Sequence, residues 1–318
     1  DTITGGAGND IITGGSGNDI ITVDSGTDDI VDLGGSGGSE SDVLVIASGA
    51  TVTADNLAGF TATSATSNNS TGAANATLTA KADAAVTIDL SSANSSTKGF
   101  TIVGGSGSGA DALTGSAGVD IITGGAAVDT IIGGAEVDTI TGNAGNDIIT
   151  GGTGNDIINV NTGTDTVLDL GGGGSGGESD VVVVASGATL TATGIAGFTA
   201  TSATSNNSTG AANATLTAKA DAAVTIDLSS ANSSTKGFTI VGGSGSGADA
   251  LTGSAGVDII TGGAAVDTII GGAEVDTITG NAGNDIITGG TGNDIINVNT
   301  GTDTVLDLGG GGSGGESD

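Results

Sequence analysis

Large aliphatic residues recur along this chain with a period of nine. In the stretch from Asp138 to Asp165, one aliphatic residue stands two positions after each aspartate: Ile140, Ile149, Ile158 and Val167. A Gly-rich hexamer such as residues 151–156 precedes each aspartate, so the unit reads G-G-x-G-x-D-x-U-x, where U is a large aliphatic residue. Side chains alternate across a strand, so U points inward and its neighbours point outward. The pattern predicts strands too short to be stable alone, joined by turns in which glycine permits a positive φ.

Three blocks carry this period, and segments of different composition separate them. We expect roll blocks at residues 1–33, 106–171 and 244–309, intervening segments at residues 34–105 and 172–243, and the start of a further segment at residues 310–318. Residues 58–180 recur without a change as residues 196–318. The chain is therefore a tandem array of one module, and such repetition suits length, reach or a lattice better than a single active site.

The intervening segments predict strands of another kind. β-Branched and apolar runs at residues 43–46, 86–90 and 100–103 alternate with Ser, Thr and Asn clusters. Residues 53–58 are compatible with one helical turn capped by Thr53. Two architectures compete: further rungs of a solenoid, or a separate small β-sandwich. Rungs are favoured, because residues 100–103 run into the next Gly-rich turn without a linker.

Composition excludes several functions. The chain has 318 residues, with 64 Gly, 36 acidic residues, four basic residues and a net charge of -32. Nucleic acid is a poor partner for such a chain, because phosphates need Lys and Arg. The sequence has no Cys and no His, which removes thiolate metal sites and the commonest general base. No stretch resembles a membrane span. We expect an all-β protein that is not an enzyme.

The aspartates are the candidate metal ligands. Each closes a Gly-rich turn with a hard carboxylate oxygen, backbone carbonyls in the turn add more, and Ca²⁺ takes six to eight oxygens in flexible geometry. The predicted calcium ligands are Asp10, Asp19, Asp28, Asp111, Asp120, Asp129, Asp138, Asp147, Asp156, Asp165, Asp249, Asp258, Asp267, Asp276, Asp285, Asp294 and Asp303. The alternative is that they only shape Asx-turns. A column of bare carboxylates would repel itself, however, and calcium binding would then supply the free energy of folding.

The turns are not equivalent in sequence. Ala127 and Glu136 replace the fourth-position glycine of their hexamers. A non-glycine residue with φ > 0 costs about 1 kcal/mol, so these turns are expected to bind calcium more weakly than those of Asp147 and Asp156. Asn9, Asn146 and Asn155, which directly precede aspartates, are expected to form turns more than to bind the ion.

The sequences GGAGNDIITGGSGND and GNAGNDIITGGTGND resemble the RTX (repeats-in-toxin) proteins of bacteria. The resemblance implies a tandem, elongated solenoid of calcium-binding parallel β-roll, in which two nonapeptides make one coil and turn n faces turn n+2. It also implies calcium bound between turns on the same side, and one-step secretion. The arrangement with intervening segments is closest in style to RTX-type surface-layer proteins and giant secreted adhesins.

Three classes of function fit these observations. The favoured one is a structural extracellular protein that forms a surface layer, filament or adhesin stalk with calcium and with copies of itself or a cell surface as partners. The alternatives are the RTX portion of a secreted enzyme or toxin, and an ice- or surface-binding module. Ser95 and Lys98 match an S-x-x-K motif, but no partner motif accompanies them. N-x-S/T sequons, whose asparagines are expected to be polar loop residues, begin at Asn68, Asn69, Asn75 and Asn94.

Overall fold

The computed structural model describes residues 1–34, 40–70, 76–95, 98–171, 178–209, 214–233 and 236–308. The regular structure in these ranges is β throughout, with no helix and hence none long and apolar enough to cross a membrane. The chain divides into two compact units, residues 1–157 and 158–318, and each is described by itself. The predicted all-β fold is confirmed as a parallel β-solenoid. The expected segment at 310–318 lies outside the described residues.

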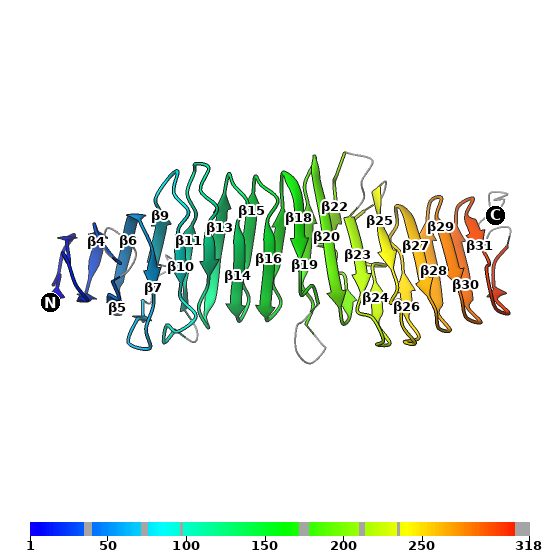
Figure 1. Cartoon of the computed structure of the whole chain (residues 1–318), viewed down its shortest axis with the longest axis horizontal. Coiled ribbons are helices and arrows are strands. Elements are labelled where there is room, and N and C mark those ends of the chain that lie inside the picture. The colour runs from blue at the N-terminus through cyan, green and yellow to red at the C-terminus, as the bar shows by residue number, and fades with distance from the viewer. Residues whose placement is uncertain are drawn as a thin grey trace. The chain divides into compact units, whose positions relative to one another are not determined.

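Unit 1 contains three parallel sheets (Figure 1). Sheet A follows the order β1 (Thr2–Thr4), β3 (Ile20–Val23), β5 (Val43–Ile46) and β8 (Ser67–Asn68). Sheet C follows the order β2 (Ile11–Ile12), β4 (Gly26–Ile30), β6 (Ala50–Leu57), β9 (Ala76–Ala80), β11 (Lys98–Val103), β13 (Val119–Gly125) and β15 (Thr139–Asn143). Sheet D follows the order β7 (Phe60–Thr61), β10 (Thr87–Asp89), β12 (Ala112–Thr114), β14 (Thr130–Ala135) and β16 (Ile148–Thr153).

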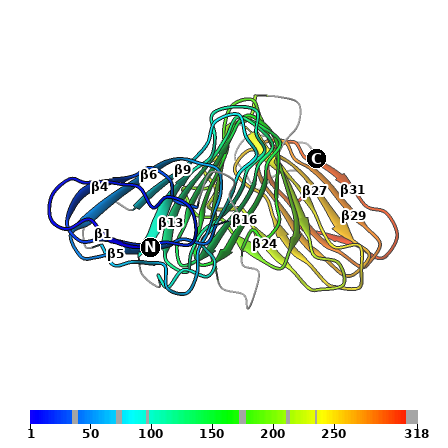
Figure 2. The same ribbon diagram turned by 60° about the vertical axis from the view of Figure 1, so that its left-hand side comes forward.

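The roll blocks are two-sided coils. Successive strands belong to opposite sheets, and each strand pairs with the strand 18 residues away, as Ile122 pairs with Ile140 and Ile131 with Ile149. Two nonapeptides therefore make one coil, which confirms the expectation that turn n faces turn n+2. Figure 2 shows the coils of unit 1 following one another in this order.

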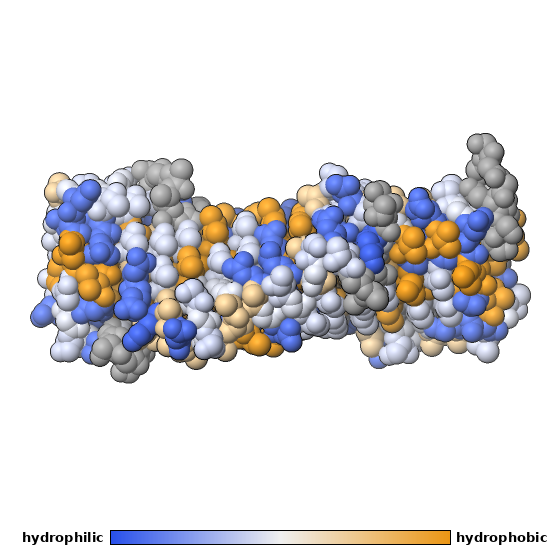
Figure 3. Space-filling model, turned by 90° about the horizontal axis from the view of Figure 1, so that it is seen from above, coloured by the Kyte–Doolittle hydropathy of each residue, from blue (hydrophilic) through white to orange (hydrophobic). Residues whose placement is uncertain are grey.

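The aliphatic residues two positions after aspartate form the core of the blocks, as predicted. In the middle block they are fully buried: Leu113, Ile122, Ile131, Ile140, Ile149, Ile158 and Val167. They are not the whole core, because Val160 and Leu170 are also buried near the end of that block. The preceding position points outward, so that Ile121 is 44% exposed and Ile148 40% exposed. Figure 3 shows apolar patches interrupted by polar side chains on the visible face.

The intervening segment forms rungs of the same solenoid. Strand β5 pairs in parallel with β3 and β8, and β6 pairs in parallel with β4 and β9, so the favoured alternative is confirmed. These rungs have three sides. After β6 in sheet C the chain passes through β7 in sheet D and β8 in sheet A before it returns to sheet C as β9. Sheet A ends here and sheet D begins, so the segment exchanges one side of the roll for another.

The prediction of a helical turn at residues 53–58 is wrong. Ala50–Leu57 is strand β6, with Ala50, Val52 and Ala54 buried in alternation. Its β-branched residues pair with neighbours on both sides, and the gain from two ladders outweighs a weak local preference for helix. The only irregularity is a register shift between Ala54 and Leu57, where Asn56 adopts a φ of 61°.

Unit 2 repeats this construction. Strand β17 (Ile157–Val160) begins at the boundary between the units and is followed in its sheet by β19 (Val181–Val184) and β22 (Ser205–Asn206). The second sheet follows the order β18 (Gly163–Val167), β20 (Ala188–Ile195), β23 (Ala214–Ala218), β25 (Lys236–Val241), β27 (Val257–Gly263), β29 (Thr277–Asn281) and β31 (Ile295–Asn297). The third follows the order β21 (Phe198–Thr199), β24 (Thr225–Asp227), β26 (Ala250–Thr252), β28 (Thr268–Ala273), β30 (Ile286–Thr291) and β32 (Thr304–Val305).

Candidate calcium centres

The aspartates stand in columns that run from coil to coil. In each step, the backbone N–H of one aspartate donates to Oδ1 of the aspartate 18 residues later. The N···O distances are 2.7 Å for Asp120 to Asp138, 2.9 Å for Asp129 to Asp147, and 2.8 Å for Asp138 to Asp156. In unit 2 they are 2.8 Å for Asp258 to Asp276 and 2.9 Å for Asp267 to Asp285. The structure thus brings the predicted residues together in two columns per block, one on each edge of the roll.

Nearly all of these carboxylates are buried. Less than 4% of the side chain is exposed at Asp19, Asp28, Asp111, Asp120, Asp129, Asp138, Asp147, Asp156, Asp165, Asp249, Asp258, Asp267, Asp276, Asp285 and Asp294. Asp10 and Asp303, in the outermost coils described, are half-buried. Burial of an ionised carboxylate is costly unless it is paired or coordinated.

The two oxygens of one carboxylate have different surroundings. Oδ1 usually accepts the coil-to-coil hydrogen bond. Oδ2 is buried without a hydrogen-bond partner at Asp10, Asp19, Asp28, Asp138, Asp276 and Asp285. A recurring buried acceptor that the protein leaves unsatisfied indicates a ligand from outside the chain.

The first glycine of each turn shows what surrounds this oxygen. A Cβ on Gly133 would lie 2.6 Å from Oδ2 of Asp138 and 2.3 Å from the carbonyl oxygen of Gly151 in the next coil. At Gly271 the same contacts are 2.6 Å to Asp276 and 2.3 Å to Gly289. Carboxylate and carbonyl oxygens therefore approach one another across a gap that only glycine leaves open.

The backbone sorts the turns into two classes. In the turns that end at Asp138 and Asp147, the second and fourth positions are left-handed: Gly134 has a φ of 126°, Glu136 of 71°, Asn143 of 70° and Gly145 of 146°. The turn that contains Ala127 has no residue with positive φ. Of the two substituted turns, only that of Ala127 therefore departs from the regular backbone, and Glu136 adopts the conformation that glycine usually supplies.

Burial changes the acidity of these groups. Burial raises the pKa of Asp138 to about 8, although the N–H of Asp120 lowers it, and the neighbouring carboxylates of Asp120 and Asp156 raise it further. The same causes raise the pKa of Asp276 to about 8. A divalent cation between coils reverses this situation, because it stabilises the ionised form.

The donor set fits calcium. It consists of hard oxygens alone, carboxylates together with backbone carbonyls, at positions that repeat along an edge. In the part of the chain that the structure describes, three or more acidic side chains nowhere form one cluster able to hold a metal. Each ion would therefore take carboxylates from two turns and complete its shell with carbonyls.

Sequence reasoning missed two further buried aspartates, Asp42 and Asp180. Asp42 is 1% exposed, and its Oδ1 accepts the N–H of Asp19 at 2.9 Å while Oδ2 accepts the N–H of Gly34 at 2.8 Å. The inward Leu44 two positions later was the available signal, but the spacing of 23 residues from Asp19 instead of 18 concealed it. Asp180 is buried likewise and accepts the N–H of Gly171 at 2.7 Å.

The asparagines before the aspartates join turns of neighbouring coils. Oδ1 of Asn9 accepts the N–H of Thr27 at 3.0 Å, and Oδ1 of Asn18 accepts that of Ser41 at 3.0 Å. At Asn9 the side chain therefore joins neighbouring coils, and the expectation that it forms its own turn stays a prediction.

The remaining motifs are also structural. Oγ of Ser95 is buried and accepts the N–H of Asn68 at 2.9 Å. Asn68 is not the polar loop residue expected from its sequon, because it is 4% exposed and its Nδ2 donates to the carbonyl of Gly99 at 2.6 Å. Asn75, and the residues between Ser95 and Lys98, lie outside the described residues.

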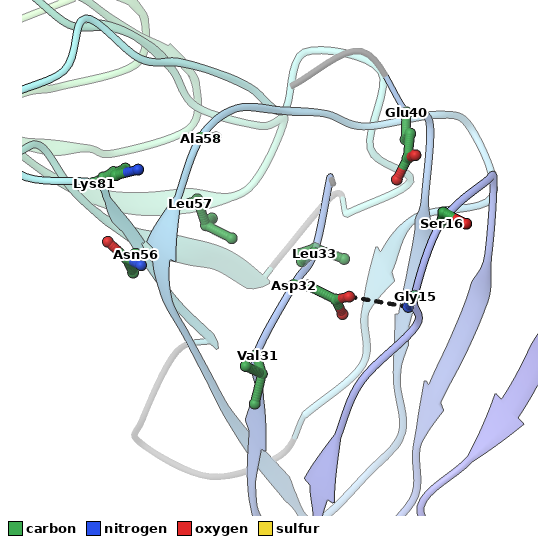
Figure 4. A pocket seen from close by; sticks show the side chains of 10 residues that line it. All are labelled: Gly15, Ser16, Val31, Asp32, Leu33, Glu40, Asn56, Leu57, Ala58 and Lys81. Carbon is green, nitrogen blue, oxygen red and sulfur yellow. Dashed lines mark hydrogen bonds between the residues drawn. The ribbon is translucent and has the colours of Figure 1, made fainter. Parts of the chain in front are cut away.

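A cavity of about 400 Å³ lies where the first block ends in unit 1 (Figure 4). Asp32, Glu40 and Lys81 line it together with apolar Val31 and Leu57. The carboxylate of Asp32 is already used, because it accepts the N–H groups of Gly14 at 2.8 Å and Gly15 at 3.0 Å.

Parallel coils with a column of buried carboxylates at each edge define a calcium-binding β-roll. The model of the RTX calcium-binding nonapeptide repeat (4 copies) matches residues 1–30, 105–140, 132–167, 243–278 and 270–305. The chain is an RTX calcium-binding β-roll protein, and its nonapeptide repeats bind Ca²⁺. It has no significant match among curated proteins or solved structures.

Proposed function

We propose that this chain is a structural, extracellular, calcium-folded repeat protein that forms a surface layer, a filament or an adhesin stalk. The observation that carries the proposal is the exact recurrence of residues 58–180 as residues 196–318, with buried carboxylate columns in both copies. A function that needs one site gains nothing from copying a whole module, whereas extension or lattice formation gains with each copy. Catalysis has no part in the proposal.

Calcium ligation in the proposal falls to the aspartates of the regular turns. These are Asp10, Asp19, Asp28, Asp138, Asp147, Asp156, Asp165, Asp276, Asp285, Asp294 and Asp303. When bound, the ion neutralises carboxylates of neighbouring coils and supplies the partner that Oδ2 of Asp138, Asp276 and Asp285 lacks in the chain itself.

Folding of the regular turns then depends on calcium. Ordering nine residues costs roughly 9 to 18 kcal/mol, and burying one Ile returns about 1.5 to 3 kcal/mol. Backbone hydrogen bonds add about 1 kcal/mol each, and the like charges of one column oppose closure. The free energy of ion binding closes this gap, because binding and folding are linked. Sites of roughly millimolar affinity are sufficient outside a cell, while low cytosolic calcium would keep the chain open for export.

Electron microscopy of the purified chain, with calcium and with chelator, tests the proposal. Sheets or fibres that appear with calcium and disappear with chelator are the expected result. Assembly that is indifferent to chelator, or monomers in both conditions at high concentration, would contradict it. A soluble chain that binds ice or another surface in calcium without self-association would favour the surface-binding alternative.

A further inference from the structure

The first two predicted calcium ligands of the middle and last roll blocks are fully hydrogen-bonded within the protein. Oδ1 of Asp120 accepts the N–H of Phe100 at 2.5 Å, and Oδ2 accepts both the N–H of Ser116 at 2.7 Å and its hydroxyl at 3.0 Å. Its copy Asp258 has the same three contacts, with Phe238 at 2.5 Å and Ser254 at 2.7 and 3.0 Å. Neither oxygen is left bare, in contrast to Asp138 and its copy Asp276 one coil later.

Asp111 and its copy Asp249 are satisfied in a similar manner. Oδ1 of Asp111 accepts the N–H of Val86 at 2.9 Å and Oδ2 that of Gly105 at 2.7 Å. For Asp249 the donors are Val224 at 2.9 Å and Gly243 at 2.8 Å. The donors at Oδ1 belong to the rungs of the intervening segment, so both carboxylates fasten the start of a roll block to those rungs.

The local backbone explains the difference. Ser116 does not have a positive φ, and its N–H points at the carboxylate four residues later. The residue at the same place in the next coil is Gly134, whose φ of 126° turns the peptide group over, and Oδ2 of Asp138 then has no partner. Serine at this position also adds a hydroxyl donor that glycine lacks. Three donors on one carboxylate stabilise its charge without an ion.

We infer that Asp111, Asp120, Asp249 and Asp258 bind no calcium and form calcium-independent clasps, from which the calcium-dependent coils extend toward the C-terminus of each block. This inference rests on the proposed calcium-dependent folding of the regular turns. The rungs on which the clasps close have the larger apolar core, with Phe60, Ile88 and Phe100 fully buried. Each module then keeps a folded nucleus in the absence of calcium, and added calcium closes the coils of Asp138 to Asp156 on it.

Hydrogen exchange of the full chain, read by mass spectrometry in chelator and in calcium, tests the inference. Peptides that cover residues 98–120 should be protected in both conditions, whereas those that cover 139–158 should be protected only in calcium. Residues 236–258 and 277–296 report together with their identical copies, so each measurement averages equivalent positions. Fast exchange of residues 98–120 in chelator would overturn the clasp. Absence of calcium-induced protection in residues 139–158 would instead contradict the proposed function.

Paired substitutions distinguish aspartates that form a clasp from aspartates that bind calcium. The double variant Asp120→Asn with Asp258→Asn should leave the number of bound Ca²⁺ ions unchanged. It should accelerate hydrogen exchange of residues 98–120 in chelator about tenfold, because the nitrogen of an amide side chain cannot accept the hydrogen bonds that Ser116 donates to the carboxylate. Asp138→Asn with Asp276→Asn, the matched control, should lose ions and leave exchange in chelator unchanged. An equal loss of ions in both pairs would refute the inference.

A second, less disruptive double variant tests the inference in case the Asp→Asn variants do not fold. Ser116→Ala with Ser254→Ala removes only the hydroxyl donor and keeps the backbone N–H. It should again retain every ion and accelerate exchange of residues 98–120 in chelator. Loss of ions, or exchange identical to that of the parent chain, would count against the clasp.

Discussion

Alanine at the first glycine of a regular turn should abolish a calcium centre without altering any ligand. We consider Gly133→Ala together with its copy Gly271→Ala. Neither glycine has a positive φ, so the backbone conformation suits alanine. The new methyl group, however, would lie 2.6 Å from Oδ2 of the turn's own aspartate and 2.3 Å from the carbonyl of the next coil. To reach a separation of 3.0 Å, the carbonyl oxygen must move by at least about 0.7 Å and the carboxylate oxygen by at least about 0.4 Å, and overpacking of this kind forces backbone shifts.

The expected loss has two parts. Overpacking costs about 1 to 3 kcal/mol per site. A centre that is lost at a calcium concentration one hundred times its dissociation constant removes a further contribution of about 2.7 kcal/mol. The free energy of unfolding in saturating calcium should therefore fall by about 4 to 6 kcal/mol per copy. In chelator the variant and the parent chain should be indistinguishable, because this turn is then open in both.

Urea unfolding at fixed calcium, together with a count of bound ions, measures this effect. Gly197→Ala is the matched control, because the nearest atom to its Cβ would be the carbonyl oxygen of Thr225 at 3.7 Å. If the Gly133 and Gly271 pair kept its full ion count and its calcium midpoint, the oxygens around these glycines would not belong to the ion's shell, and the reasoning would fail.

Three further predictions use other properties of the fold. Burial raises the pKa of Asp138 and Asp276 from 3.8 to about 8 in the folded chain, so their contribution to the stability of the calcium-free roll is present at low pH and lost as pH rises through 8. Circular dichroism in chelator should therefore show roll structure gained as the pH is lowered from 8 to 4. Roll structure lost on acidification would contradict this. Ile140→Ala with Ile278→Ala empties fully buried positions and should cost about 2 to 5 kcal/mol per site in calcium, measured by urea unfolding against the exposed control Ile148→Ala with Ile286→Ala. The elongated shape expected from the sequence is tested by small-angle scattering in calcium, where a compact globule would refute it.

The sequence predicted the repeating part of the structure because one short pattern determines it. The aliphatic residue after each aspartate identified the core, and the alternating run at residues 43–46 became strand β5 with the expected bounds. The clasps were not predictable in this way. Asp120 matches the repeat, and two partners distinguish it from Asp138: Ser116, which replaces a turn glycine, and Phe100, which lies outside the roll block and contacts Asp120 only in the folded chain. Asp42 was hidden by an insertion, which preserves the spatial column while it breaks the spacing along the chain.

The replacement of sheet A by sheet D in the intervening rungs affects how accurately the coils pair in the correct register during folding. Coils built from nearly identical nonapeptides have many registers of similar energy, since a slip by 18 residues places one isoleucine where another was. Tandem copies with identical sequence add the hazard of pairing between copies. A three-sided rung that buries Phe60 and Phe100 does not fit into a two-sided coil. Each intervening segment therefore stops a register slip, because a slip that begins in one roll block cannot continue through the next three-sided rung.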